Sequence, residues 1–106
     1  MFGRKRKIAK ADELRKQANE LQKNQDRLID KWIQANEGKS VNEQKKIDEK
    51  YIKLLDEADE QSNNAYKIYY DFVHKNFKKS EIDEAVNSTK NFMGKAFINK
   101  LINRKK

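Results

Sequence analysis

The residues in this sequence with the clearest chemical capacity are cationic. Residues 4–7 are four consecutive basic residues, and residues 1–10 contain five basic residues and no acidic one. A second basic group falls at residues 67–79. Ammonium and guanidinium groups gathered on one surface bind phosphates and release the counterions that screened them. The predicted nucleic-acid-binding residues are Arg4, Lys5, Arg6, Lys7, Lys67, Lys75, Lys78 and Lys79.

Aromatic residues are interleaved with the second basic group. Rings stacked on unpaired bases contribute ~1 to 3 kcal/mol per base, so they could extend a phosphate-binding surface into one for single strands. The alternative is that most of the rings fill the protein core, and that the basic residues only keep a small, charged chain soluble. The aromatic residues concerned are Tyr66, Tyr69, Tyr70, Phe72 and Phe77.

Catalytic chemistry has little support in the residue types. The chain has one histidine, His74, and no cysteine, so neither a zinc ligand set nor an activated cysteine or histidine pair can be assembled. Paired carboxylates recur at residues 48–49, 56–57 and 59–60, but carboxylates interleaved with lysines along a helix are typical of a solvated face. We therefore expect a non-enzymatic protein without a cofactor, a metal ion or a small-molecule substrate.

The composition is that of long, solvated helices. Hydrophobic residues make up 36% of the chain and charged residues 40%, with no proline and three glycines. We expect one domain over residues 1–106, with a basic N-terminal arm (1–8) and a basic C-terminal tail (103–106). A chain of this size buries a limited core, so part of its stability is expected from a partner or from self-association. With no signal peptide or membrane span, we expect a soluble protein of the cytoplasm or of a virion.

The first helix is predicted from about Ile8 to Asn36. Its apolar residues alternate steps of three and four, which is a heptad seam with Gln25 as the one polar member. A polar seam residue indicates either a specific partner on another helix or a tolerated position near solvent. The seam consists of Ala11, Leu14, Ala18, Leu21, Gln25, Leu28, Trp32 and Ala35.

A long central helix is predicted over Ser40–Lys79. Gly38 can end the first helix in the left-handed conformation, and Ser40 with Glu43 forms a capping box for the second. The two helices should therefore form an antiparallel hairpin, which brings residues 1–10 beside Lys67–Lys79. Residues 62–64 are a weak point, because Ser and Asn side chains compete for backbone hydrogen bonds; we favour continuity.

A shorter third helix is predicted to begin at a cap formed by Ser80 and Asp83 and to end at about Ile102. Gly94 lies inside this helix, and we interpret it as the site of a close helix crossing. The expected fold is all-α, an elongated antiparallel three-helix bundle, or four helices if the central helix breaks near Ser62–Asn64. The C-terminal tail, Asn99–Lys106, should then lie beside the acidic residues Asp56, Glu57, Asp59 and Glu60.

A different class of function is protein interaction, as an adaptor, a coiled-coil homo-oligomer, or a virion or secretion-partner component. The C-terminal helix carries more apolar surface than the central helix alone could cover. A third class is attachment to an anionic membrane surface, because residues 92–106 form a basic amphipathic segment. The predicted interaction residues are Phe92, Phe97, Ile98, Leu101 and Ile102.

Overall fold

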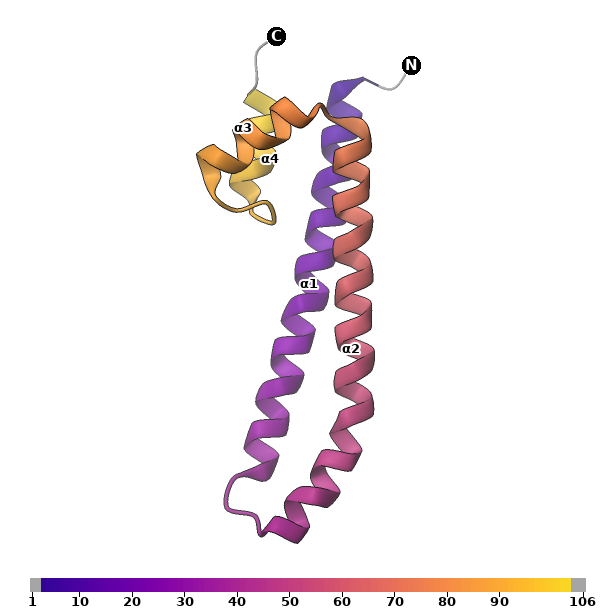
Figure 1. Ribbon diagram of the computed structural model, residues 1–106, viewed down its shortest axis with the longest axis vertical. Helices are drawn as coiled ribbons and strands as arrows, with labels where there is room; N and C mark the ends of the chain where they lie inside the picture. The colour runs from indigo at the N-terminus through magenta and orange to yellow at the C-terminus, as the bar shows by residue number, and fades with distance from the viewer. Residues whose placement is uncertain (1–2, 104–106) are drawn as a thin grey trace.

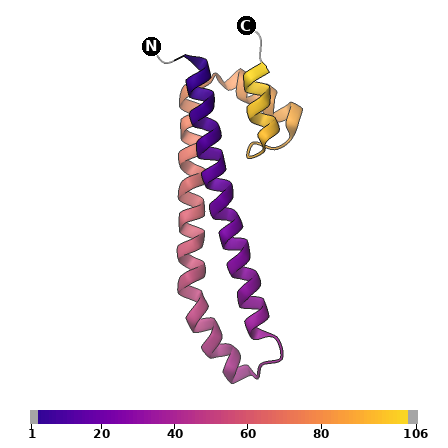
Figure 2. The same cartoon turned by 180° about the vertical axis from the view of Figure 1, so that it is seen from behind.

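A computed structural model describes residues 3–103, and every regular element within that range is a helix. The first two helices form an antiparallel hairpin, and the last two fold back against the end of the hairpin where the chain starts (Figures 1 and 2). The first and last described residues therefore lie at the same end. The helices are α1 (Arg4–Asn36), α2 (Val41–Asn76), α3 (Lys79–Thr89) and α4 (Lys95–Asn103).

The molecule is elongated, and its core occupies one end. Its extents are 62 × 26 × 17 Å and its radius of gyration is 18.6 Å, against about 13 Å for a compact domain of similar length. Toward the loop that connects them, α1 and α2 diverge (Figure 1), and not one residue between positions 19 and 61 is buried. The core residues are Ile8, Ala11, Leu14, Tyr69, Val73, Phe77, Ile82, Ala85, Phe97, Ile98 and Leu101.

The hairpin loop forms as its residues predict. Gly38 adopts φ +69°, a left-handed conformation that costs glycine little. The Ser40 hydroxyl accepts a hydrogen bond from the Glu43 backbone N–H (3.2 Å), and the Glu43 carboxylate accepts one from the Ser40 backbone N–H (3.3 Å). This capping box satisfies two amide groups that the first turn of α2 would otherwise leave unpaired.

The long helix α2 is continuous through residues 62–64, as favoured from its apolar period. Ser62 is buried, and its hydroxyl donates to Gln22 Oε1 across the hairpin (3.0 Å). Gln25, the polar member of the first heptad seam, donates from Nε2 to Asp59 Oδ1 (3.0 Å). These two polar contacts join α1 to α2 at fixed positions and so help to set the register of the hairpin.

The predicted third helix is wrong in its length, because it is broken in two. Lys90 has φ +60° and ends α3, and the Asn91 side chain accepts a hydrogen bond from the Met93 backbone N–H (3.1 Å). A Cβ at Gly94 would lie 2.8 Å from Asn91 Nδ2, so this glycine makes room for the turn. Gly94 therefore serves a chain reversal and not a helix crossing.

This break changes the architecture. The three-helix bundle is wrong, and the four helices agree in number with the alternative, although the break falls at residues 90–94 and not near Ser62–Asn64. The other helix ends also shift: α1 begins at Arg4, so residues 4–8 are helical. Lys78 precedes α3, and its backbone N–H donates to the Glu81 carboxylate (3.2 Å), in place of the cap expected at Ser80.

The reversal also overturns the predicted place of the chain end. Arg4 Nη2 donates to the Leu101 backbone carbonyl (2.8 Å), so the end of α4 lies beside the start of α1. The acidic middle of α2, Asp56 to Glu60, is far along the hairpin from it (Figure 1). Residues 104–106 of the predicted tail lie outside the described residues.

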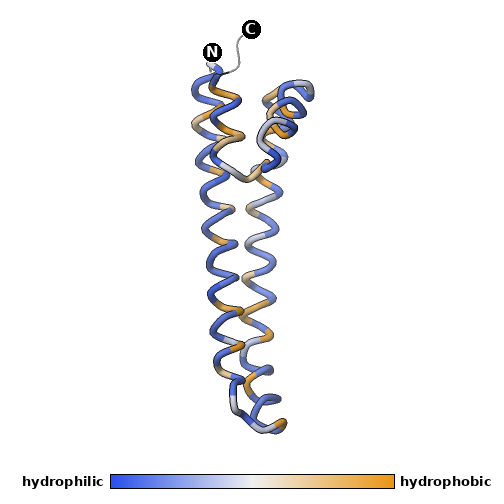
Figure 3. Tube along the Cα trace, turned by 90° about the vertical axis from the view of Figure 1, so that its left-hand side faces the viewer, coloured by the Kyte–Doolittle hydropathy of each residue, from blue (hydrophilic) through white to orange (hydrophobic). Residues whose placement is uncertain are grey.

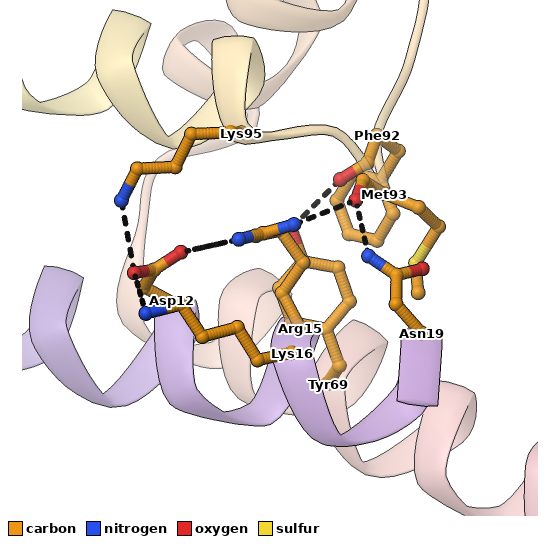
Figure 4. Close-up of polar contacts among 8 residues, drawn as sticks. All are labelled: Asp12, Arg15, Lys16, Asn19, Tyr69, Phe92, Met93 and Lys95. Atoms are coloured by element: carbon orange, nitrogen blue, oxygen red, sulfur yellow. Dashed lines mark hydrogen bonds and ion pairs between the residues drawn. The ribbon is translucent and has the colours of Figure 1, made fainter. Parts of the chain in front are cut away.

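A polar cluster joins α1 to α4 and to the turn before it (Figure 4). Asp12 is its centre: its carboxylate binds Arg15 (2.9 Å), Lys95 (2.9 Å) and, more weakly, Lys16 (3.5 Å). The Asp12 and Arg15 side chains are only 14% and 10% exposed. Charge pairs with so little exposure are screened weakly by salt, and removing one partner would leave the other charge buried without its counter-charge.

The same cluster holds the backbone of the turn. Two consecutive carbonyl groups accept side-chain hydrogen bonds from both long helices (Figure 4). The Tyr69 hydroxyl donates to the Phe92 carbonyl (2.7 Å), and Arg15 Nη1 and Asn19 Nδ2 donate to the Met93 carbonyl (3.3 and 2.9 Å). The position of α4 therefore depends on α1 and α2 together.

The Asp12 carboxylate should make stability depend on acid pH. Burial alone raises the pKa of Asp12, but hydrogen bonds from Lys95 and Arg15 outweigh it and hold the pKa below the usual 3.8. A folded-state pKa below the unfolded value stabilises the protein above pH ~4, and this contribution is lost as the pH falls through the folded value. Urea unfolding from pH 7 to 2.5 should show a smaller loss of stability for Asp12→Asn than for the wild type; equal losses contradict the assignment.

Candidate polyanion-binding surface

The first turn of α1 is cationic where a helix favours anions. It contains no acidic residue, and its N-cap, Gly3, makes no side-chain capping bond. The helix dipole is positive at this end, so each cation there costs about 0.3–1 kcal/mol at low salt, and an anion is favoured by a similar amount. The cations at residues 4–7 therefore oppose helix formation wherever no anion neutralises them, and within the molecule the Glu81 carboxylate neutralises Arg4.

The antiparallel hairpin brings the end of α2 beside this turn, which places the two basic groups at one end of the molecule as the predicted hairpin implies. A groove lies between the two helices there, lined by Arg6, Lys7 and Lys10 from α1 and by Phe72 and Asn76 from α2. We refer to these five residues as the basic groove. A phosphate in it would meet three cations from two adjacent turns of α1.

Two of the predicted cations are engaged elsewhere. Arg4 Nη2 lies 2.6 Å from Glu81 Oε1, and its guanidinium lies 5.5 Å from the centre of the Phe77 ring. With its bond to Leu101, Arg4 thus connects α1, α3 and α4. Lys79 Nζ lies 2.9 Å from Asp83, whose hydrogen bond and charge raise the pKa of Lys79.

The other predicted cations do not form one cluster; Lys7 is half-buried and the rest are exposed. Lys5 lines a separate recess on the α4 side, together with Lys95. Lys67 precedes Lys75 by eight residues, about 12 Å along α2. Lys78 lies between α2 and α3. The predicted set is therefore spread around the end of the molecule, and only Arg6 and Lys7 line the basic groove.

Lys10, Phe72 and Asn76 complete the groove, although the predicted site set did not contain them. Lys10 follows Arg6 by four residues and Lys7 by three, so the three share one face of α1. This spacing is visible in the sequence, and it could have identified Lys10 as part of the site. Asn76 Nδ2 donates to the Phe72 carbonyl (2.8 Å) on the last turn of α2, and no residue pattern indicated it.

Two of the five aromatic residues named from the sequence lie in the core. Tyr69 and Phe77 are buried, and burial raises the pKa of the Tyr69 phenol. Tyr66 and Tyr70 are partly exposed and pack around Phe92, with ring centres 6.3 and 5.9 Å from it. The core-filling alternative therefore holds for Tyr69 and Phe77. Phe72 remains as the one ring that lines the basic groove.

His74 belongs to the same aromatic group. Its ring stacks on Tyr70 with centres 3.9 Å apart, and its Nδ1 lies 2.9 Å from the Tyr70 carbonyl oxygen. Within residues 3–103 no cluster of three His, Cys, Asp or Glu side chains could hold a metal ion.

The predicted protein-interaction surface is wrong for three of its five residues. Phe97, Ile98 and Leu101 are at most 1% exposed, because the turn at residues 90–94 folds α4 onto α1 and α3. Phe92 is half-buried, and only Ile102 is largely exposed, at 53%. The apolar face proposed for membrane attachment is this same buried face. Among the helices of the described chain, none is both long and apolar enough to cross a membrane.

Comparison of the chain with protein-family models, curated proteins and solved structures finds no match.

Proposed function

We propose that this protein is a non-enzymatic, polyanion-binding helical protein, with nucleic acid as the leading ligand and the basic groove as its contact surface. The observation that carries the proposal is the cationic first turn of α1, which the helix dipole disfavours. Local rules of helix design are broken chiefly where a function requires it. A bound phosphate would remove the conflict, since it attracts both the cations and the helix end.

Binding through the groove would be electrostatic and weakly selective. Arg6, Lys7 and Lys10 neutralise phosphates of the backbone, and the partly exposed Phe72 offers an apolar surface to an unpaired base. Three phosphate contacts predict a slope of about −2 for log K against log salt on a single strand. Such a ligand would be held mainly by charge, so binding should weaken steeply as the salt concentration rises.

Fluorescence anisotropy with labelled single-stranded DNA and RNA of about 20 nucleotides tests this over a salt series. Lys7→Ala with Lys10→Ala should lower the affinity at least about tenfold and reduce the slope by about 1.4, because two contacts are lost. Lys45→Ala with Lys46→Ala is the matched control: it removes the same charge from exposed residues near the hairpin loop. Equal losses for the two variants, or no binding by the wild type at low salt, contradict the proposal.

Protein interaction is the second candidate, and a specific observation favours it. The hairpin beyond α3 and α4 is a single layer of two helices, yet hydrophobic residues recur along both of them (Figure 3). Ile33 is 49% exposed, Ile52 60% and Leu54 43%. Helices that expose apolar side chains along their length usually bury them against a further helix.

A further inference from the structure

Helix α2 carries a second heptad seam beside the face that meets α1, and three of its eight residues are exposed while the other five are half-buried. Eight residues alternate steps of four and three over 26 positions, and seven of them are apolar. Such a repeat is the pattern by which one helix packs along another. None of the eight is buried. This outer seam consists of Ile47, Tyr51, Leu54, Ala58, Gln61, Ala65, Ile68 and Phe72.

The rest of the molecule packs mainly on neighbouring faces of α2, although the seam residue Phe72 also lines the groove between α1 and α2. α1 meets the neighbouring line of residues, where Ser62 and Asp59 bind Gln22 and Gln25. Phe92, in the turn before α4, packs against Tyr66 and Tyr70, which are not members of the seam. Within the outer seam, Leu54 is 43% and Ile68 is 56% exposed.

We propose that the outer seam binds the outer seam of a second copy of this chain, with the two α2 helices antiparallel. This inference names the partner for the second candidate function, on which it rests, and does not depend on polyanion binding. A two-fold axis between the copies makes each half of the contact identical to the other. It also gives the single-layered part of the hairpin a second layer of helices.

Charge complementarity selects a second copy and its direction. Lys50 and Asp71 flank the seam, each one residue before a seam residue, Tyr51 and Phe72. In an antiparallel pair whose centre lies between positions 58 and 61, Lys50 of one copy is opposite Asp71 of the other, twice per dimer. A parallel pair would instead place Lys50 against Leu55 of the second copy and Asp71 against Asn76, and neither Leu55 nor Asn76 is charged.

The side-chain sizes fit the same register. It places the larger Leu54 opposite Ala65 and Gln61 opposite Ala58 at the centre of the contact, while the outer layers pair Ile47 with Phe72 and Tyr51 with Ile68. Gln61, the polar member, then lies near the two-fold axis and marks the register, as a polar seam residue does in coiled coils. The paired segments are about 39 Å long at a rise of ~1.5 Å per residue.

Sedimentation equilibrium of the purified protein over a concentration series, without polyanion, tests the self-association. We expect a monomer–dimer equilibrium in which Leu54→Glu raises the dissociation constant at least about tenfold, because each dimer then buries two charges. Ile52→Glu is the matched control: the same change on the same helix at a more exposed residue outside the seam, which should leave the constant unchanged. A monomer at every concentration, or equal effects of the two variants, overturns the proposal.

Disulfide trapping tests the direction of the pair, since the chain has no cysteine of its own. In the antiparallel register the two copies of residue 61 are offset by about 4.5 Å along the axis and those of residue 54 by about 16 Å. Gln61→Cys should therefore form a disulfide-linked dimer on mild oxidation, and Leu54→Cys should not. Efficient trapping of both variants indicates a parallel pair and overturns the antiparallel arrangement.

Phe72 belongs to both the outer seam and the basic groove, so neither set of variants alters it. If the Lys7 and Lys10 variant loses nucleic-acid binding but still dimerises, the result supports the proposal that the basic groove binds polyanions and says nothing against the dimer. If the Leu54 variant no longer dimerises but still binds nucleic acid, the result supports the proposal that the outer seam is the dimer contact and says nothing against polyanion binding. Failure of one proposal is thus distinguishable from failure of the other.

Discussion

Phe97→Ala should lower the free energy of unfolding by about 3–5 kcal/mol, the usual cost of deleting a buried aromatic ring. Phe97 is 0% exposed and its ring centre lies 4.9 Å from that of Phe92, so its removal leaves a cavity between α4 and the hairpin. Urea unfolding followed by far-ultraviolet circular dichroism measures the change. Because Phe97→Ala can unfold a domain of marginal stability, Phe97→Leu provides a milder variant with a loss of about 1–2 kcal/mol.

Ile102→Ala is the matched control for Phe97, because both residues lie on α4 but Ile102 is 53% exposed. We expect this change to cost less than about 1 kcal/mol. A loss below about 1 kcal/mol for Phe97→Ala would mean that α4 does not pack on the hairpin. The interaction surface predicted from the sequence of α4 would then be exposed after all.

Arg15→Met should destabilise the protein by about 3 kcal/mol, at the lower end of the range for removing one partner of a buried ion pair. Methionine retains much of the apolar stem, so the loss reports the guanidinium. That group binds Asp12 and donates to the Met93 carbonyl, and the Arg15 side chain is 10% exposed. Lys95 remains on Asp12, which limits the cost of the change.

Lys16→Met is the control for Arg15→Met, because Lys16 also pairs with Asp12 but is 67% exposed. Exposed pairs contribute ~0–1 kcal/mol, so its loss should be small. A double-mutant cycle between Arg15→Met and Asp12→Asn isolates the pair, and we expect a coupling of about 1–2 kcal/mol. Coupling near zero would show that the Arg15–Asp12 pair within α1 contributes no stability.

The hairpin was readable from the sequence because local interactions specify it. Gly38 ends one helix and Ser40 with Glu43 starts the next, all within six residues. The heptad period of α1 and the resumption of the apolar period after Ser62 indicated two long, continuous helices. The same reasoning placed the two basic groups at one end, since an antiparallel hairpin brings the start of α1 beside the end of α2.

The turn at residues 90–94 was not readable in the same way. The residues before and after it share one helical period, and a lysine at φ +60° leaves no mark in the sequence. The helix ends there because Tyr69, Arg15 and Asn19 bind the two turn carbonyls from other helices. These contacts repay the lost backbone bonds, so tertiary structure overrode the local preference for a continuous helix.

The sequence by itself determined the helical class and the hairpin with its caps, because these depend on residues within a few positions of one another. Only the tertiary structure decided the fate of individual side chains. Arg4 is bound by Glu81 and Leu101, which are 77 and 97 residues away, and α4 is core and not a docking face. Such contacts depend on where the chain reverses, which no local spacing specifies.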